Sequence, residues 1–128
     1  MIVLEERLLK NGMKRLVSNM LTLPIKKKWM DMILSGEKKE EYRELKPYYM
    51  HRFNRLWFGS MIGFKAKRKI RFRNGYGRNA PSFIAVCTLD IGEGRPEWGA
   101  QRGKDYYILK IVEVMNEDLQ GESQAFKF

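Results

Sequence analysis

The spacing of hydrophobic positions changes along the chain and marks the elements that the sequence predicts. Residues 21–25 alternate apolar and other side chains with a period of two. This pattern, interrupted at Pro24, predicts a short strand near the edge of a sheet, because proline donates no backbone hydrogen bond. Between Lys26 and Leu34 the apolar residues recur every three or four positions, which predicts an amphipathic helix. Gly36 is suited to end that helix.

The second half of the chain predicts another helix and then strands. Pro47 is favourable as the first residue of a helix, and an aromatic stripe along residues 48–58 predicts its core face. Basic and apolar residues alternate in the strand that follows, so one of its faces is strongly cationic. A glycine-rich hairpin turn at 74–81 leads to an almost continuously apolar strand, which we expect to be central and buried on both faces. The predicted strands are 65–73, 82–91 and 106–115.

These elements predict one α+β domain spanning residues 20–116. Helices near the N-terminal half followed by several strands lack the regular alternation of a parallel α/β sheet. We therefore expect a small closed β-barrel flanked by two helices. Residues 1–19 are broken by Asn11-Gly12 and are either an extension outside the fold or a part of it. Residues 117–128 are expected to form a polar tail.

A charged segment, Gly-Glu-Lys-Lys-Glu-Glu-Tyr-Arg at residues 36–43, joins the first helix to a predicted strand. Strand alternation places Glu41 and Arg43 on one face and Glu40 and Tyr42 on the other. One face therefore carries a carboxylate beside a guanidinium. Lys38 follows the helix-ending glycine too closely for alternation to fix its direction, so it is a candidate for the same cluster.

This segment reads G-x-K-x-x-E-x-R and resembles the signature of the ASCH (ASC-1 homology) domain family. Gly36, Lys38, Glu41 and Arg43 occupy the four fixed positions. The preceding strand and helix fit the same family, and the similarity extends over about residues 20–114. The resemblance implies a PUA-like barrel with the motif in a cleft. The later segments that also resemble the family are 71–77, 91–94, 97–100 and 106–114.

The net charge and the basic segment at residues 61–80 indicate an anionic partner. The formal net charge is +10, and residues 61–80 hold seven Lys and Arg residues and no acid. We expect binding of RNA, other single-stranded nucleic acid or a nucleotide, with Arg43 contacting a phosphate or base edge and Tyr76 stacking on a base. Trp98, in a long glycine-rich loop, is either a packed lid or a second stacking residue. The residues expected to attract phosphate are Lys65, Lys67, Arg68, Lys69, Arg71 and Arg73.

An enzymatic function is the principal alternative. Some proteins of the resembled family are hydrolases of modified cytidine or are described as ribonucleases, and Lys38 matches the lysine of the hydrolases. Glu41 stands where those amidohydrolases carry threonine, which weakens this interpretation. Lys38 and Glu41 are nevertheless the candidate catalytic acid and base if a pocket shifts their pKa values towards neutrality. The sequence is also compatible with a purely structural Glu41–Arg43 ion pair and with a protein-interaction domain.

The remaining predictions concern the cellular compartment, metals and cofactors, membranes and the oligomeric state. The single cysteine, Cys87, lies in an apolar run, is expected to be buried and favours a reducing, cytoplasmic setting. His51 has no partner at metal-ligand spacing, so we expect no metal site, and nothing in the sequence implies a cofactor. The chain has no run of eighteen apolar residues, so no membrane association is expected. We expect a monomer.

Overall fold

The computed structural model describes residues 20–115, and the predictions for residues 1–19 and 117–128 lie outside this range. Two α-helices and five strands form an α+β arrangement in the described chain, with short 3₁₀ turns η1 and η2 between strands. No helix in this range is long and apolar enough to cross a membrane. The elements are β1 (Thr22–Pro24), α2 (Lys27–Leu34), β2 (Glu40–Glu44), α3 (Pro47–Trp57), η1 (Gly63–Lys65), β3 (Arg68–Arg73), β4 (Ser82–Glu93), η2 (Pro96–Trp98) and β5 (Asp105–Met115).

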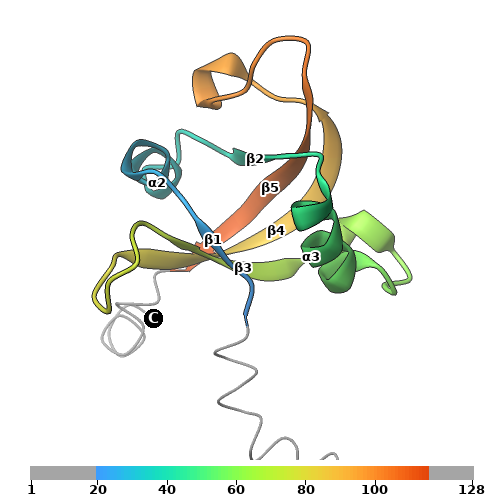
Figure 1. Ribbon diagram of the computed structural model, residues 1–128, viewed down its shortest axis with the longest axis horizontal. Coiled ribbons are helices and arrows are strands. Elements are labelled where there is room, and N and C mark those ends of the chain that lie inside the picture. Colours follow the sequence, from blue (N-terminus) through green and yellow to red (C-terminus); the bar gives the residue numbers. More distant parts are fainter. Residues whose placement is uncertain (1–19, 116–128) are drawn as a thin grey trace, which may run out of the picture.

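The five strands form one curled sheet in the order β1-β3-β4-β5-β2. β1 runs parallel to β3, and the other neighbouring pairs are antiparallel. The predicted hairpin joins β3 to β4, with Arg73 opposite Ser82. Figure 1 shows how the curl brings β2 across the open side of the sheet, with α2 before it and α3 after it. The motif strand therefore lies over the concave face of the sheet.

The sheet is a half-barrel and not the closed barrel that the sequence predicts. Among the described strands, β1 and β2 are the two edges, and each pairs with a single neighbour. β1 is only three residues long and ends at Pro24, after which the chain turns into α2. A strand this short, with no N–H at its last residue, offers little ladder for β2 to join.

The core fills the concave face and is covered by the helices. Met30 and Ile33 of α2 and Phe53 and Trp57 of α3 are buried, as their spacing predicts. Leu34, which belongs to the same apolar stripe as Met30 and is expected in the core, is instead 45% exposed at the last residue of α2. The buried strand residues in this core are Leu23, Ile70, Phe72, Phe83, Ala85, Cys87, Leu89, Tyr107 and Leu109.

β4 is the central strand, as predicted. It pairs with β3 on one side and β5 on the other. Its residues are buried on both faces only from Phe83 to Ala85. From Val86 to Leu89 buried and partly buried residues alternate, and Asp90 and Ile91 are exposed. Its second half therefore extends beyond the core and leads into the loop that carries η2.

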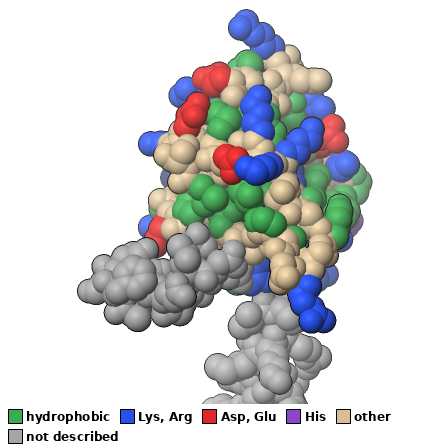
Figure 2. Space-filling model, turned by 90° about the vertical axis from the view of Figure 1, so that its left-hand side faces the viewer, with side chains coloured by type: hydrophobic (Ala, Val, Ile, Leu, Met, Phe, Trp, Pro, Cys, Tyr) green, Lys and Arg blue, Asp and Glu red, His purple; other side chains and the backbone are tan. Residues whose placement is uncertain are grey.

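Basic and acidic side chains are interspersed on part of the surface. Figure 2 shows a face on which Lys and Arg are interspersed with Asp and Glu around a group of hydrophobic side chains. Exposed ion pairs of this mixed kind include Lys27–Asp31 on α2 and Lys110–Asp90 between β5 and β4. Such exposed pairs contribute little to stability.

Candidate functional site

The motif strand β2 directs a carboxylate and a guanidinium into the protein. Glu41 and Arg43 are buried, whereas the residues on either side of each are more exposed. Glu41 lies opposite Leu109, and Arg43 opposite Tyr107, so all four side chains share the concave face. The alternation predicted from the sequence is confirmed.

Lys38 joins this pair and completes a buried cluster of three charges. Its Nζ lies 3.2 Å from Oε1 of Glu41, while Nη2 of Arg43 lies 2.6 Å from Oε2. The exposed fractions of the Lys38, Glu41 and Arg43 side chains are 1%, 8% and 9%. Two cations flank a single anion, so the cluster carries a net positive charge. Burying charges is costly unless each one is paired, and here each has a partner.

The turn after α2 sets the position of Lys38. Gly36 has φ +88°, a left-handed conformation that glycine adopts without strain, and its N–H donates to the carbonyl of Ile33. The Lys38 N–H then donates to Met32 O. This turn directs the Lys38 side chain inward, which strand alternation alone does not indicate.

The Lys38 ammonium group has contacts on several sides. Its ammonium donates to the carbonyl of Trp98 at 2.5 Å and lies over the rings of Trp29 and Tyr42, at 4.8 Å and 4.9 Å from their centroids. Burial lowers the pKa of Lys38 from its ordinary value, although the Glu41 carboxylate acts in the opposite direction. The motif lysine therefore ties α2, β2 and the η2 loop together.

A pocket of about 710 Å³ lies next to the cluster. Residues of both sheet edges, β1 and β2, contribute to its wall, so it occupies the region where the sheet does not close. Glu41 and Arg43 line it, but Lys38 is not among the lining residues. The lining consists of Pro24, Ile25, Lys26, Trp29, Glu41, Tyr42, Arg43, Glu44, Lys46, Tyr49, Asn74, Gly75, Tyr76 and Tyr106.

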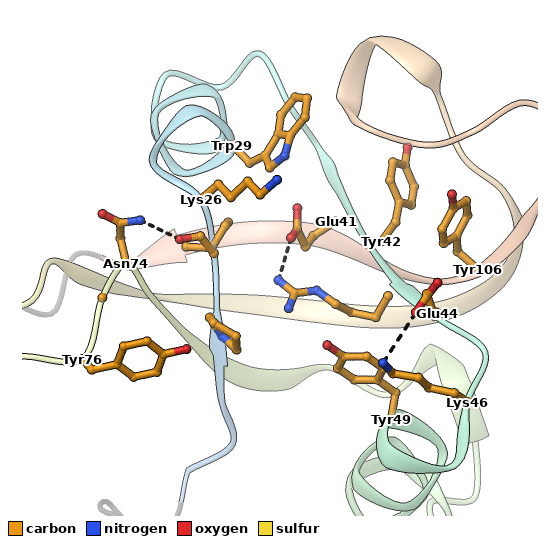
Figure 3. Close-up of a pocket in the computed structure, with 14 residues that line it drawn as sticks. Lys26, Trp29, Glu41, Tyr42, Glu44, Lys46, Tyr49, Asn74, Tyr76 and Tyr106 are labelled. Atoms are coloured by element: carbon orange, nitrogen blue, oxygen red, sulfur yellow. Dashed lines mark hydrogen bonds and ion pairs between the residues drawn. The ribbon is translucent and has the colours of Figure 1, made fainter.

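Aromatic side chains surround the charged floor of this pocket. In Figure 3, Trp29 and Tyr49 lie on opposite sides of Glu41, and Tyr76 lies across the pocket from Tyr42 and Tyr106. Arg43 also packs near aromatic faces, with its guanidinium carbon 6.0 Å from the centre of the Tyr49 ring. The pocket thus combines flat apolar surfaces with a guanidinium group, a combination suited to a planar ligand.

The hairpin contributes Tyr76 to the pocket. Tyr76 is 93% exposed, and the turn that carries it is tied to β1 by a hydrogen bond from Asn74 Nδ2 to the carbonyl of Ile25. Arg73 donates to Gly77 O within the same turn. The structure therefore brings Tyr76 to the same pocket as Glu41 and Arg43, although about thirty residues separate them in the sequence.

The cationic face of β3 lies on the other side of the sheet. Ile70 and Phe72 are buried, and Arg43 packs over the Phe72 ring at 5.9 Å, so these residues face the motif cluster. Alternation then directs Lys69, Arg71 and Arg73 towards the opposite face. The basic strand does not line the pocket. The lysines that do are Lys26 and Lys46, which the sequence analysis does not select.

The other predicted basic residues have distinct roles. Lys65 and Lys67 are exposed in and after η1. Arg68 is partly buried, and its Nε donates to the carbonyl of Leu56 at 2.7 Å, which fixes the end of α3 against β3. Arg68 thus has a structural role alongside its charge.

Trp98 contributes to the site through its backbone. Its carbonyl accepts the hydrogen bond from Lys38, while its ring is partly buried and stacked under the guanidinium of Arg95, 4.8 Å from the ring centre. The ring is not part of the pocket lining. Of the two roles expected for Trp98, this arrangement is closer to a packed lid over the cluster.

Cys87 lies in the core, as expected. It is a free, fully buried cysteine in β4, and burial raises the pKa of its thiol to about 12. A protonated, inaccessible thiol is a poor nucleophile. Within residues 20–115 there is also no group of three or more His, Cys, Asp and Glu side chains arranged to hold a metal ion.

Several pocket residues that the sequence does not indicate are aromatic. Tyr49 falls in the core stripe predicted for the second helix, and Trp29 in the apolar stripe of the first. Both are only partly buried and also face the pocket. Residue size does not distinguish Tyr49 from Phe53 and Trp57, which share its stripe and are fully buried, so the sequence carries no signal for this role.

Comparisons with known proteins do not assign this chain to a group: no family model matches it, and neither the curated proteins nor the solved structures contain a significant match.

Proposed function

We propose that the protein binds RNA or another single-stranded nucleic acid, or a nucleotide, in the pocket between β1 and β2. The observation that carries the proposal is the conjunction of Arg43, Trp29, Tyr49 and Tyr76 around one cavity of about 710 Å³. Aromatic faces stack on bases regardless of sequence, and a guanidinium can bond to a base edge or a phosphate. We further propose that the domain is an ASCH-type, PUA-like module, on the strength of the G-x-K-x-x-E-x-R motif.

In this proposal the side chains have separate tasks. Arg43 keeps one nitrogen on Glu41, and its remaining donors contact the ligand. Lys26 and Lys46 attract phosphate at the rim, and the aromatic rings hold the base. Glu41 and Lys38 act as positioning residues, because their mutual contacts fix the guanidinium in the floor of the pocket. The cations of β3 face the other side of the sheet and attract nucleic acid outside the pocket.

Fluorescence anisotropy with a labelled single-stranded RNA, compared with a mononucleotide as competitor, tests the proposal. We expect saturable binding that weakens as salt is raised and that is reduced by substitution of Arg43 or Tyr49. Arg95→Lys is the matched control, because Arg95 is exposed, pairs with Glu97 and does not line the pocket. Absence of binding to both ligands at low salt would refute the proposal.

Hydrolysis of a modified nucleoside is the second candidate function. It is favoured by the contact between Lys38 and Glu41 and by the lowered pKa of Lys38, because a proton-transfer pair needs both features. The burial of Lys38 away from the pocket lining argues against it. Incubation with acylated nucleosides such as N4-acetylcytidine, followed by chromatography, decides between the two. Turnover that is lost in both Lys38→Met and Glu41→Gln would favour the hydrolase.

A further inference from the structure

The loop between α3 and β3 exposes a group of large apolar side chains. Phe58 and Met61 are 82% and 102% exposed, and Ile62 and Phe64 are 64% and 37% exposed. We call these four residues the apolar loop. In Figure 1 it projects beyond the C-terminal end of α3. Single exposed apolar residues are ordinary, but a contiguous group marks a surface that contacts a partner.

Backbone and side-chain hydrogen bonds hold the apolar loop in this outward arrangement. Trp57 is fully buried, and its Nε1 donates to the carbonyl of Ala66 at 2.7 Å, which closes the base of the loop. The N–H of Phe58 donates to Asn54 O, and the N–H of Ala66 to Gly63 O. The apolar side chains thus project from an anchored turn, so their exposure is a property of the fold.

The chain on both sides of the apolar loop is basic. Between Glu44 and Asp90 the sequence contains ten Lys and Arg residues and no Asp or Glu. Arg55, Lys65 and Lys67, which are all exposed, lie closest to the loop in the chain. A partner must therefore be anionic and must also offer an apolar surface. A second copy of the same basic surface does not meet the first condition.

Nucleic acid meets both conditions where a base face is accessible. Phosphates pair with the flanking lysines, whereas bases within an uninterrupted duplex are covered by their neighbours. Apolar Phe, Ile and Met side chains insert at unstacked base steps, which nucleic-acid-binding proteins use as anchoring points. Lys65 and Lys67 also continue directly into β3, so the loop adjoins the cationic strand. Because the pocket proposed for single-stranded nucleic acid is lined by the start of α3 and the apolar loop follows the end of α3, nucleic acid is favoured over a membrane as the occupant.

We infer that the apolar loop packs against the exposed base face at the junction between an RNA stem and its single-stranded tail, while the tail enters the pocket. This inference rests on the proposed function. Tyr49 lies in α3 and lines the pocket, and Phe58 directly follows the last residue of α3, nine residues later, or about 14 Å along the helix axis. Stacked nucleotides at roughly 3.4 Å each span this distance with about four units. The substrate class is thus a stem with an adjoining tail.

Two labelled RNAs test the inference: a single strand of about eight nucleotides, and a hairpin stem that carries the same strand as its tail. We expect the wild type to bind the hairpin with the tail on the order of tenfold more tightly than the single strand, because one or two additional bases stack on the apolar loop. The double variant Met61→Ser/Ile62→Ser should lose this preference and keep the affinity for the single strand. Ile91→Ser/Val112→Ser is the matched control, because both residues are exposed and lie on β4 and β5, outside the apolar loop.

The outcomes separate the inference from the function on which it rests. Equal affinity of the wild type for the two RNAs, or a preference that survives in the loop variant, overturns the inference and leaves the pocket proposal intact. Weakened single-strand binding in Arg43→Lys supports the pocket independently. If the wild type binds neither RNA, both proposals fail. Binding to vesicles of phosphatidylcholine and phosphatidylglycerol that disappears in the loop variant assigns the loop to a membrane and also overturns the inference.

Discussion

Nη2 of Arg43 lies 2.6 Å from Oε2 of Glu41, and the two residues point in the same direction from a single strand. The contact is buried, so it differs from the exposed ion pairs elsewhere on the surface. Because Arg43 also lines the pocket, the carboxylate fixes the orientation of a guanidinium that faces the cavity. This relationship provides the first prediction.

Arg43→Lys should weaken RNA binding by about tenfold, because lysine keeps the charge and loses the planar pair of donors. The dissociation constant from fluorescence anisotropy measures the effect, and Arg95→Lys controls for a charge-conserving change outside the pocket. Unfolding temperatures of both variants should first show that each is folded. Unchanged affinity in Arg43→Lys would remove the guanidinium from the interface.

Lys38→Met should destabilise the protein by about 1–3 kcal/mol, because the Trp98 carbonyl loses its donor while Glu41 keeps Arg43 as its partner. Chemical denaturation measures the free energy of unfolding. The loss of unfolding free energy in the double variant Lys38→Met/Glu41→Gln should be smaller than the sum of the losses in the two single variants. The reason is that the amide introduced by Glu41→Gln is neutral, so the charge that Lys38 balances is already gone. Additive effects would show that the contact of 3.2 Å contributes no coupling.

The lowered pKa of Lys38 predicts how stability changes with pH. Since the folded-state pKa lies below that of the unfolded chain, the unfolded state binds more protons between the two values, and stability increases with pH in that window. The unfolding temperature of the wild type should therefore rise relative to that of Lys38→Met as the pH approaches 10.5, the ordinary value. The comparison with the variant removes the opposing effect of Tyr42, whose pKa is raised by burial.

The exposed cations should contribute to the salt dependence of binding. Changing Lys65, Lys67 and Lys69 to glutamine should reduce the slope of log affinity against log salt by roughly 0.7 for each single-strand phosphate that these lysines neutralise. Lys110→Gln, which removes a cation paired with Asp90, serves as the control. A triple variant with the wild-type slope would show that this surface does not touch the RNA backbone.

Cys87 should be unreactive in the native protein. A thiol-specific reagent at a pH of about 8 should label it only after denaturation, because it is buried and its pKa is raised to about 12. Absorbance of the released chromophore measures the reaction. Rapid labelling without denaturant would contradict the burial of β4 in the core.

Local periodicity is sufficient to predict the elements and the direction of Glu41 and Arg43. Each of those predictions depends on a pattern within a few consecutive residues, such as the alternation along β2 or the stripe that contains Met30 and Ile33. Leu34 follows the same stripe and is nevertheless exposed, because periodicity does not state where the contact with the sheet ends.

The pocket could not be predicted in this way. Its wall combines residues from α2, β2, the start of α3, the β3–β4 turn and β5, and no local pattern indicates which of them meet. The position of the basic residues of β3 relative to the pocket depends on the curl of the sheet. Lys26 and Lys46, which are the rim lysines, resemble ordinary surface residues in the sequence.

The hydrogen bond from Lys38 to the carbonyl of Trp98 joins residues 60 positions apart. Contacts between distant residues form late in folding, because the intervening chain must first be ordered. The cluster can bury its charges only after β5 has paired with β2 and the η2 loop has closed over Lys38. A nascent chain therefore cannot assemble the charge cluster until synthesis has passed β5.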